Sequence, residues 1–435
     1  MREIRSLSMI LSCLYNLIFT LFLLLYLPSL FLKSLFRSSF RESLTERLAF
    51  YPSLSHLRPI WVHAASMGEV LCSLPLIRKI KEEFPSFSII LTTMTHAGRE
   101  TARKNPAGVD WILYFPFDHP FILKRAFRRL SPSLLLLAET ELWPNLLRLC
   151  GEKGIPLVLF NGRISQKSIG RYRFLKSFFK TPLRSISLFL MQTEEDQRRI
   201  LQMGAPLEKI RVTGNLKFDQ TVSPLEKKRW DENSIFLFRE SGPLLIAGST
   251  HSGEEEVLLR LLKRLKKSHP SLRLLLAPRH LDRLEEVERL LRREGLSWVR
   301  KTALHTKEGE EGEEVILLDT LGELKMLYQY ATIVFIGGSL VPVGGHNPLE
   351  PLFFKKCLLF GPHMFNFMEI SKRLVDYGGA IQVNGEEELA FQLDHLLRDE
   401  GKRREIGEKG HEFVQFHRGA LERTMNEIRP YLLGR

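Results

Sequence analysis

Short, continuously apolar runs alternate with amphipathic stretches along most of this chain. In the first half, such runs lie at 60–62, 88–92, 134–138, 157–160 and 188–191. The runs do not alternate between apolar and polar residues, which is typical of strands in a parallel sheet that is covered on both faces. Between the first two runs, the apolar residues of 69–84 recur at the spacing of a helix. The pattern predicts a parallel α/β domain.

The same alternation starts again after a more polar stretch at 221–241, which we take as the connection between two domains. Helical patterns occupy 254–267 and 282–293. The strands predicted in this half lie at 244–247, 272–277, 315–318, 332–336, 357–360 and 380–383. Repeated β and α units predict two doubly wound, Rossmann-like domains, 41–222 and 240–435, with a last helix that could pack back on the first domain.

An uncharged segment, residues 9–32, precedes both domains. A helix that crosses a membrane needs about 20 mostly apolar residues, so residues 1–40 are predicted to form a retained transmembrane anchor helix. A cleaved signal peptide fits poorly, because the run is long and lacks small residues at its end. A buried or monotopic helix remains the alternative. Basic residues flank both ends, so charge alone does not set the orientation.

Composition and charge narrow the class of partner. The 435 residues are 44% hydrophobic and 26% charged, as in a folded globular chain, and carry a formal net charge of +13. Such charge indicates an anionic partner: nucleic acid, an acidic membrane surface or an acidic substrate. Nucleic acid is the weaker choice, because no helix-turn-helix, RRM or KH signature is visible. The four cysteines form no CxxC pair, which favours reduced thiols in a cytosol-facing protein.

Polar clusters follow the predicted strands of the first half, where doubly wound sheets bind ligands. Glu69 ends the cluster HAASMGE, and it is either a first-turn carboxylate that favours the helix dipole or a general base. In the second role, the helix N-terminus would lower its pKa and keep it ionised at neutral pH. Glu139 and Glu141 follow a buried strand, which is costly unless they are paired or functional. Lys217 could neutralise a departing phosphate or form a surface salt bridge.

The second half carries a similar series of strand-end clusters. Its longest member is 335–351, FIGGSLVPVGGHNPLEP, where paired glycines let backbone approach a ligand and a predicted helix start could bind an anion. Arg279 follows another strand and suits bidentate contact with phosphate. Strand-end residues that could support a ligand are Ser249, Thr250, Gly337, Gly338 and Ser339. The series predicts a nucleotide crevice in this domain.

Other chemistries find little support in the motifs. The histidines show neither HExxH nor another metal-ligand spacing, so no metal site is predicted. The GxSxG elbow of serine hydrolases and the Walker phosphate loop are absent from the sequence.

Taken together, the motifs resemble one family. HAASMGE, ETELWPN, GNLKFD, GSTHSGEEE, APRH, GGSLVPVGGHNPLEP and GPHMFNF look like the motif series of the lipid A 3-deoxy-D-manno-octulosonic acid (Kdo) transferases, which are GT-B glycosyltransferases. The resemblance runs to about residue 378. Met67, Gly162 and Leu281 depart from the usual pattern, at positions to which we assign no chemistry.

The resemblance implies inverting, metal-independent and cofactor-free transfer of Kdo from CMP-Kdo to a lipid A precursor (lipid IVA) on the cytoplasmic face of the bacterial inner membrane. It implies that Glu69 is the base and that Glu139 and Lys217 stabilise the transition state. The residues it implies for CMP contact are Pro278, Arg279, Leu321, Gly322, Glu323, Asn347, Pro348, Leu349 and Glu350. The number of Kdo units, their linkages and the oligomeric state stay open.

Two alternatives to Kdo transfer are kept. One is another membrane-associated GT-B glycosyltransferase that uses a UDP-sugar and a different lipid, and the other is a nucleotide or lipid binder without activity. The stretch 171–180 interleaves basic and aromatic residues, so we expect it near the anionic membrane and the acceptor entrance. An ordinary amphipathic helix is the alternative for that stretch.

Overall fold

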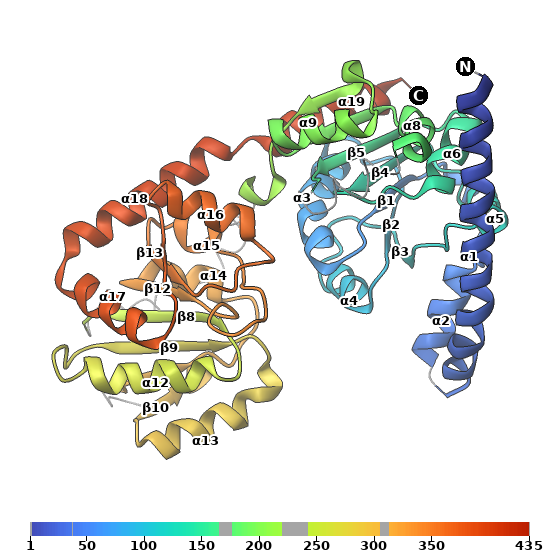
Figure 1. Cartoon of the computed structure of the whole chain (residues 1–435). Helices are drawn as coiled ribbons and strands as arrows, with labels where there is room; N and C mark the ends of the chain where they lie inside the picture. Colours follow the sequence, from blue (N-terminus) through green and yellow to red (C-terminus); the bar gives the residue numbers. More distant parts are fainter. Residues whose placement is uncertain (1, 37, 165–175, 220–241, 305–312, 435) are drawn as a thin grey trace. The chain divides into compact units, whose positions relative to one another are not determined.

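The chain folds into two compact units (Figure 1). The computed structural model describes residues 2–36, 38–164, 176–219, 242–304 and 313–434. Unit 1 comprises Met1–Gln220 and Arg418–Arg435, and unit 2 comprises Thr221–His417. The predicted connection at 221–241 lies outside the described residues.

Unit 1 is built on a parallel seven-stranded sheet in the order β3-β2-β1-β4-β5-β6-β7. Its strands are β1 (Ile60–His63), β2 (Ile89–Thr93), β3 (Trp111–Tyr114), β4 (Leu134–Ala138), β5 (Leu157–Gly162), β6 (Leu188–Met191) and β7 (Ile210–Val212). The strand order reverses direction between β1 and β4, which pair in parallel. Ligands of doubly wound sheets bind at the carboxyl ends of the strands beside such a reversal.

Helices cover both faces of this sheet (Figure 1). The helices of unit 1 are α1 (Arg2–Phe36), α2 (Ser38–Arg47), α3 (Met67–Glu83), α4 (His96–Lys104), α5 (Pro120–Leu130), α6 (Pro144–Lys153), α8 (Lys176–Arg184), α9 (Glu194–Met203) and α19 (Ala420–Leu433). Short 3-10 turns lie at Ser55–Leu57, Leu207–Lys209 and Leu216–Asp219. The C-terminal α19 packs on this unit, because Met425 and Ile428 belong to one of its two cores.

The continuous apolar runs are explained by the two cores. In β4, Leu135 and Leu137 face one core, while Leu134 and Leu136 face the other. Since successive strand residues point to opposite faces, a strand that is buried on both sides needs apolar residues at every position.

Unit 2 repeats the architecture with a parallel sheet in the order β10-β11-β9-β8-β12-β13-β14. Its strands are β8 (Leu244–Thr250), β9 (Arg273–Pro278), β10 (Trp298–Arg300), β11 (Val315–Leu317), β12 (Ile333–Ile336), β13 (Cys357–Phe360) and β14 (Ile381–Gln382). Its helices are α12 (Glu254–Leu265), α13 (Leu284–Glu294), α14 (Leu324–Leu327), α15 (Leu349–Leu352), α16 (Met368–Asp376), α17 (Glu386–Arg398) and α18 (Glu400–His417). Short 3-10 turns lie at Leu281–Arg283, Lys301–Ala303 and Tyr328–Tyr330. The reversal lies between β8 and β12.

The predicted architecture of two doubly wound parallel α/β folds is confirmed. Three strands were not predicted: β3, β7 and β10. Each is only three or four residues long and forms an edge of its sheet. β7 and β10 each contain an arginine, so their apolar signal is weak, whereas β3 is a short apolar run that sequence reasoning missed.

Candidate active site

The turn between β1 and α3 fixes the side chain of Glu69. Ser66 caps α3 by accepting a hydrogen bond from the Glu69 N–H, at 3.3 Å. In return, the Ser66 hydroxyl donates to Glu69 Oε1 at 2.9 Å and the Ala65 N–H donates to Oε2 at 2.8 Å. This is a variant of the capping box, because the N–H that binds Glu69 belongs to Ala65, the residue before the N-cap. The carboxylate therefore stands at the carboxyl end of β1, next to the strand reversal.

The charge state expected for Glu69 from the sequence is corrected by this geometry. Burial raises the pKa of Glu69 to about 7, with a further contribution from the negative charge of Glu139. The bonds from Ala65 and Ser66 lower the pKa but do not offset burial. A helix N-terminus alone would have kept the carboxylate ionised at neutral pH. Instead, Glu69 titrates near neutrality, where a general base gains most from its pKa.

Glu139 lies at the end of β4, the strand that neighbours β1. Its backbone is left-handed, with φ of 54°, and its N–H bonds to the carbonyl of Phe160 at 3.0 Å. Asn161, near the end of β5, is also left-handed, with φ of 52°. Such a conformation is unfavourable for residues other than glycine and clusters at functional sites. The turn directs the chain away from the sheet directly after the strand ends.

Lys217 lies in the 3-10 turn after β7. The Asn161 side chain holds this turn by accepting a 3.0 Å hydrogen bond from the N–H of Leu216. The thiol of Cys72, on α3, is fully buried, and the charges near it shift its pKa. Burial and the charge of Glu139 raise the pKa of Cys72 to about 12, while Lys217 lowers it and Glu69 raises it further. The charges of the three predicted catalytic residues of unit 1 thus all act on the Cys72 thiol, and the turn that carries Lys217 packs on α3.

Glu141 has a different environment from Glu139. Trp143 donates its indole N–H to Glu141 Oε2 at 2.8 Å, and the buried His63 Nε2 lies 3.6 Å from the same oxygen. Burial would raise the pKa of Glu141, but His63 and Trp143 lower it below its usual value. His63 also stacks on Phe115, with ring centroids 3.8 Å apart. This carboxylate at the strand end is therefore paired within unit 1.

In unit 2, a buried carboxylate organises the glycine-rich loop after β12. Glu254, the first residue of α12, accepts four backbone hydrogen bonds of 2.6 to 3.0 Å. The four donors are the N–H groups of His251, Gly338, Ser339 and Leu340. Burial raises the pKa of Glu254, and these hydrogen bonds oppose that effect. The N–H groups of residues 338–340 thus hold a carboxylate of the protein itself.

Close packing explains the glycines of this loop. A Cβ at Gly337 would lie 2.5 Å from the carbonyl oxygen of Ser249 and 2.6 Å from Cα of Thr250. Gly338 is left-handed, with φ of 66°, a conformation that glycine adopts without strain. Ser339 is buried, and its hydroxyl accepts from the N–H of Gly361 at 2.8 Å. These contacts are structural, and the proposed support of a ligand by this loop stays a prediction.

A histidine pair and Arg279 lie beside the same loop. The Nε2 atoms of His251 and His346 are 2.8 Å apart, and the two rings are stacked at 5.1 Å. Burial lowers the pKa of His346 to about 3, helped by the positive charge of Arg279 and by His251. Burial also lowers the pKa of His251, with His280 and Arg279 contributing. One neutral ring therefore donates to the other, and Arg279 supplies fixed positive charge next to them.

Pro278 ends β9, next to the buried Thr250 of β8, and Arg279 directly follows the strand. The N–H of Arg279 bonds to the carbonyl of Thr250 at 3.0 Å. The Thr250 hydroxyl is buried and has no hydrogen-bond partner among the described residues. Ser249 has a left-handed backbone, with φ of 58°. The predicted ligand-supporting residues of β8 and the predicted donor residues of β9 are therefore adjacent.

The remaining predicted donor residues lie in two short turns. Leu321 is 68% exposed, Gly322 is left-handed, and Glu323 accepts from Lys301 at 3.1 Å and from the Thr320 hydroxyl. The second turn holds the segment 347–350. There, the Asn347 side chain accepts from the N–H of Leu349 at 3.1 Å and donates to Glu350 at 3.2 Å, while Leu349 is buried.

The helix start expected after the second glycine pair is only one turn long. Helix α15 spans Leu349–Leu352, with Pro348 as its N-cap. So short a helix has little macrodipole, and the Asn347 side chain takes up one of its free N–H groups. The expected helix is therefore a capped turn, and anion binding at this segment stays a prediction. In the described parts of the chain, no group of three or more His, Cys, Asp or Glu side chains could hold a metal ion.

Sequence reasoning missed the roles of four residues that organise the two clusters. Glu254 was quoted only as part of GSTHSGEEE, although a run of three acidic residues at a helix start is a signal for such a role. The pairing of His251 with His346 joins residues 95 positions apart, so no local pattern indicates it. Asn161 shows no distinctive spacing, although its side chain holds the turn that carries Lys217.

Two doubly wound parallel units with polar clusters at their strand reversals define the GT-B class. The UDP-GlcNAc 2-epimerase of Neisseria meningitidis bound to UDP-GlcNAc has this fold, with a TM-score of 0.56 at 12% identity, covering 87% of this chain and 100% of the other. The MnaA–UDP structure from S. aureus gives 0.55 at 14% identity, over 86% of this chain and 97% of the other. At such identities the likeness concerns the fold alone.

Sequence comparison gives the family. Residues 42–220 match the family described as 3-deoxy-D-manno-octulosonic-acid transferase (kdotransferase). The 3-deoxy-D-manno-octulosonic acid transferase of Haemophilus influenzae is 38% identical over 392 residues, covering 89% of this chain and 91% of the relative. That of Chlamydophila psittaci is 33% identical, over 86% of this chain and 85% of the relative. The chain belongs to the Kdo transferase family of glycosyltransferases.

Proposed function

We propose that this protein transfers Kdo from CMP-Kdo to a hydroxyl group of an anionic lipid A precursor, lipid IVA, in lipopolysaccharide core biosynthesis. The observation that carries the proposal is the grouping of Glu69, Glu139 and Lys217 at the strand reversal of unit 1 in a chain of this family. A sugar-nucleotide donor follows from the family, and CMP-Kdo and lipid IVA are the specific substrates we assign.

In the proposed reaction, Glu69 acts as the general base. It takes the proton of the acceptor hydroxyl while that oxygen attacks the anomeric carbon of Kdo. The bond from this carbon to the phosphate oxygen breaks, and CMP leaves with the bonding electrons. One displacement inverts the anomeric centre, so no second carboxylate is needed as a nucleophile. A pKa of Glu69 of about 7 suits a base that must accept a proton near neutral pH.

The same cluster offers a way to offset the charge that develops. Lys217 supplies a positive charge for the departing phosphate, a form of electrostatic stabilisation that acts most strongly in a site shielded from water. The negative charge of Glu139 raises the pKa of Glu69 and so makes Glu69 a stronger base. We assign both residues to transition-state stabilisation.

We assign donor binding to unit 2. CMP carries a phosphate, and Arg279 provides fixed positive charge beside the neutral pair of His251 and His346. The exposed Leu321 and left-handed Gly322 offer apolar surface and accessible backbone for the nucleoside. The proposed donor residues are Pro278, Arg279, Leu321, Gly322, Glu323, Asn347, Pro348, Leu349 and Glu350, supported by Ser249, Thr250, Gly337, Gly338 and Ser339.

The membrane supplies the acceptor in this proposal. Helix α1 contains an apolar segment, Ile10–Leu32, that is long enough to anchor the chain. We propose that the protein is attached to the inner membrane with its catalytic units on the cytoplasmic face. Residues 171–175 of the basic and aromatic stretch lie outside the described residues, whereas 176–180 form the start of α8. Unchanged membrane affinity and acceptor KM after charge reversal at Arg171, Arg173 and Lys176 would reject a role for that stretch.

Donor competition tests the proposed function against its main alternative. CMP should inhibit transfer competitively with CMP-Kdo, whereas UDP at the same concentration should not. Inhibition by UDP together with turnover of a UDP-sugar would replace Kdo transfer by the other GT-B reaction. If neither donor is turned over on any anionic glycolipid, the protein is a binder without activity.

A further inference from the structure

We propose that helix α1 lies in the plane of the membrane surface, docked along unit 1, instead of crossing the bilayer. Its outer face would be embedded in the lipid monolayer, and its N-terminus would stay on the same side of the membrane as the catalytic units. The partner is a phospholipid bilayer, contacted along the side of the helix. This topology is independent of the substrate assigned above.

A row of polar side chains fastens the first half of α1 to unit 1. Tyr15 donates its hydroxyl to Oδ2 of Asp118 at 2.9 Å, and Asp118 is fully buried. The amide Nδ2 of Asn145, which is also buried, donates to Oδ1 of Asn16 at 2.7 Å. Further along, Thr20 Oγ1 lies 3.3 Å from a ring nitrogen of His119. Three consecutive contacts on one helix face define a specific interface.

Apolar packing supports the same face. Leu11 and Tyr15 pack against a core of unit 1, and the ring centroid of Tyr15 lies 5.7 Å from that of Phe178 on α8. Leu23, in the middle of the apolar segment, is only 6% exposed. From Leu11 to Leu23 the docked face is about 18 Å long, at 1.5 Å per residue. If the docked helix crossed the bilayer, this contact would extend through more than half of the hydrophobic thickness, which is about 30 Å.

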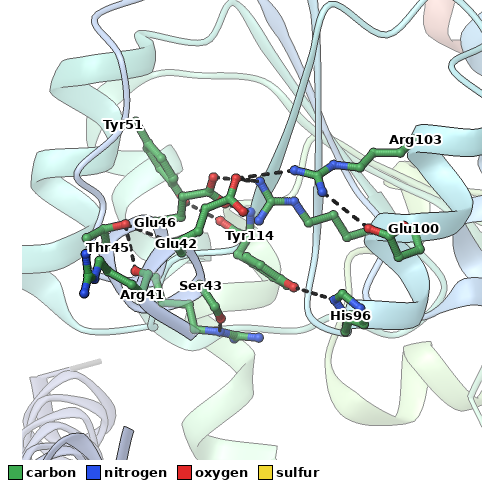
Figure 2. A network of polar contacts seen from close by, with 12 residues as sticks. Arg41, Glu42, Ser43, Thr45, Glu46, Tyr51, His96, Glu100, Arg103 and Tyr114 are labelled. Carbon is green, nitrogen blue, oxygen red and sulfur yellow. Dashed lines mark hydrogen bonds and ion pairs between the residues drawn. The ribbon is translucent and has the colours of Figure 1, made fainter. Parts of the chain in front are cut away.

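The second half of α1 packs on α2, which is itself fixed to unit 1 (Figure 2). Glu42 and Glu46 of α2 both bind Arg99, at 2.5 and 2.9 Å. The other oxygen of Glu46 accepts from the N–H of Tyr114, the last residue of β3, at 2.7 Å. Tyr51 donates to the carbonyl of Tyr114 at 2.7 Å. Because Glu46 and Arg99 are largely buried, α2 is firmly attached to the rest of unit 1, and it holds the second half of α1 there.

The opposite face of α1 is apolar and has large exposed side chains. Leu17 is 58% exposed, Leu21 53% and Leu25 82%. Phe121 on α5 is 77% exposed, and its ring lies 5.6 Å from that of His119, which contacts α1. A continuous exposed apolar surface of this kind marks a binding site. The segment Ile10–Leu32 carries no charge along its length, which fits the acyl region of lipids.

A transmembrane orientation would conflict with the docking contacts. If α1 crossed the bilayer while docked, Asp118, Asn145 and the backbone around them would enter hydrocarbon. Irregular backbone and polar groups at that depth are tolerated only where protein or water surrounds them. If α1 undocked first, the buried Asp118 would lose Tyr15, and Leu11 and Tyr15 would leave the core of unit 1. If α1 lies in the membrane interface, its docked face keeps its hydrogen bonds to unit 1 and its outer face contacts lipid.

The docking site adjoins the proposed catalytic loop of unit 1. Asn145 belongs to the first turn of α6, which begins directly after the segment 139–143 that carries Glu139. Asp118 accepts from the N–H groups of Asn145 and Leu146 at 3.1 and 2.9 Å, and so caps the same helix. If the proposed function holds, the in-plane helix attaches the membrane next to the site that receives a lipid acceptor.

Depth measurements along the outer face test the topology. Single cysteines at Leu14, Leu21, Leu25 and Leu32, in a Cys13→Ser background, are labelled with bimane in the full-length protein in vesicles and quenched by lipids that carry spin labels at different depths. An in-plane helix predicts depths that agree within about 5 Å, near the boundary of headgroups and acyl chains. A spanning helix predicts positions spread over about 27 Å from Leu14 to Leu32. Either that spread or absence of quenching at all four positions overturns the proposal.

Cross-linking tests the docked face directly. A short bis-maleimide applied to membranes should link Asn16→Cys to Asn145→Cys at least 5-fold more efficiently than the matched control pair Leu17→Cys with Asn145→Cys. If Asn145→Cys lowers the amount of folded protein, the pair Thr20→Cys with His119→Cys replaces it. Equal linking of the test and control pairs would contradict docking. These readouts need no turnover, so they stand whether or not Kdo transfer is observed.

Discussion

The backbone N–H of Ala65 donates a 2.8 Å hydrogen bond to Oε2 of Glu69, so the carboxylate is turned back over the start of its own helix. The same group is buried beside the charge of Glu139, and its pKa is raised to about 7. A residue that satisfies a capping box would normally be ionised and inert. Its raised pKa distinguishes Glu69 from an ordinary helix cap and supports its assignment as a base.

The pH dependence of transfer should follow Glu69. Because the base must be deprotonated, kcat/KM should rise with pH and level off above about 7. Glu139→Gln removes a negative charge that raises this pKa, so the midpoint should move to lower pH even though the maximum rate falls. The measurement is kcat/KM from pH 5 to 9 for both proteins. An unchanged midpoint in the variant would show that the charge of Glu139 does not affect the pKa of the base.

Glu254 should be essential for the glycine-rich loop of unit 2. In Glu254→Gln, one carboxylate oxygen becomes an NH₂ group that faces backbone N–H donors, so at least one buried donor loses its partner. We expect a loss of about 3 kcal/mol in the stability of unit 2 and at least 10-fold weaker binding of CMP. Calorimetry measures both quantities.

Glu256→Gln is the matched control for this prediction, because Glu256 lies on the same helix and accepts a single hydrogen bond from Gly253 at 3.0 Å. A glutamine can still accept that bond, so the cost should be at most about 1 kcal/mol. Equal effects of the two substitutions would mean that Glu254 has no special role in the loop.

The histidine pair of unit 2 should remain neutral through the physiological range. Burial and Arg279 lower the pKa of His346 to about 3, and His251 is lowered in the same direction. Spectra of the protein labelled with ¹⁵N-histidine should therefore show no protonation of His346 between pH 8 and 5.5, and His251 should titrate below its ordinary value. A midpoint near the ordinary value of about 6.5 for His346 would show that the ring is solvated and the pairing with His251 is broken.

Asp118 should give the protein a specific pH dependence of stability. Burial raises the pKa of Asp118 from 3.8 to about 7 in the folded state. A carboxyl with a raised folded pKa contributes stability that is fully present below its unfolded pKa and is lost as the pH rises through the folded value. In Asp118→Asn this titration is absent.

The melting temperature of the Asp118→Asn variant, relative to wild type, should thus rise by on the order of 5 °C from pH 4 to 7.5 and then stay constant. Melting curves in detergent across this range provide the measurement. If the difference in melting temperature between variant and wild type is constant from pH 4 to 7.5, Asp118 keeps its usual pKa.

Much of the fold could be predicted from local patterns. The runs 134–138, 188–191 and 357–360 match β4, β6 and β13 residue for residue, because strands buried on both faces leave an uninterrupted apolar signal. The short edge strands β7 and β10 lack that signal, because each contains an arginine and exposed positions. The apolar segment of α1 was recognised, but composition does not show which of its faces is docked.

The candidate site was predictable only in part. Sequence position placed Glu69 and Glu139 at strand ends, and the parallel pairing of β1 with β4 brings those ends together. The pKa of Glu69 could not be predicted, because the burial next to Glu139 that raises it is a property of the tertiary structure. For the same reason, the occupation of the loop N–H groups by Glu254 depends on the fold of unit 2.

The central claim is Kdo transfer with Glu69 as the base, and mass spectrometry of the product tests it most directly. Purified protein is incubated with CMP-Kdo and lipid IVA, in parallel with Glu69→Gln and with Glu82→Gln, an exposed residue near the end of the same helix. Wild type and Glu82→Gln should add Kdo to the lipid and release CMP at similar rates, while Glu69→Gln should be at least about 100-fold slower with CMP binding unchanged. Product formation by Glu69→Gln within a few-fold of wild type, or none by wild type, would contradict the account.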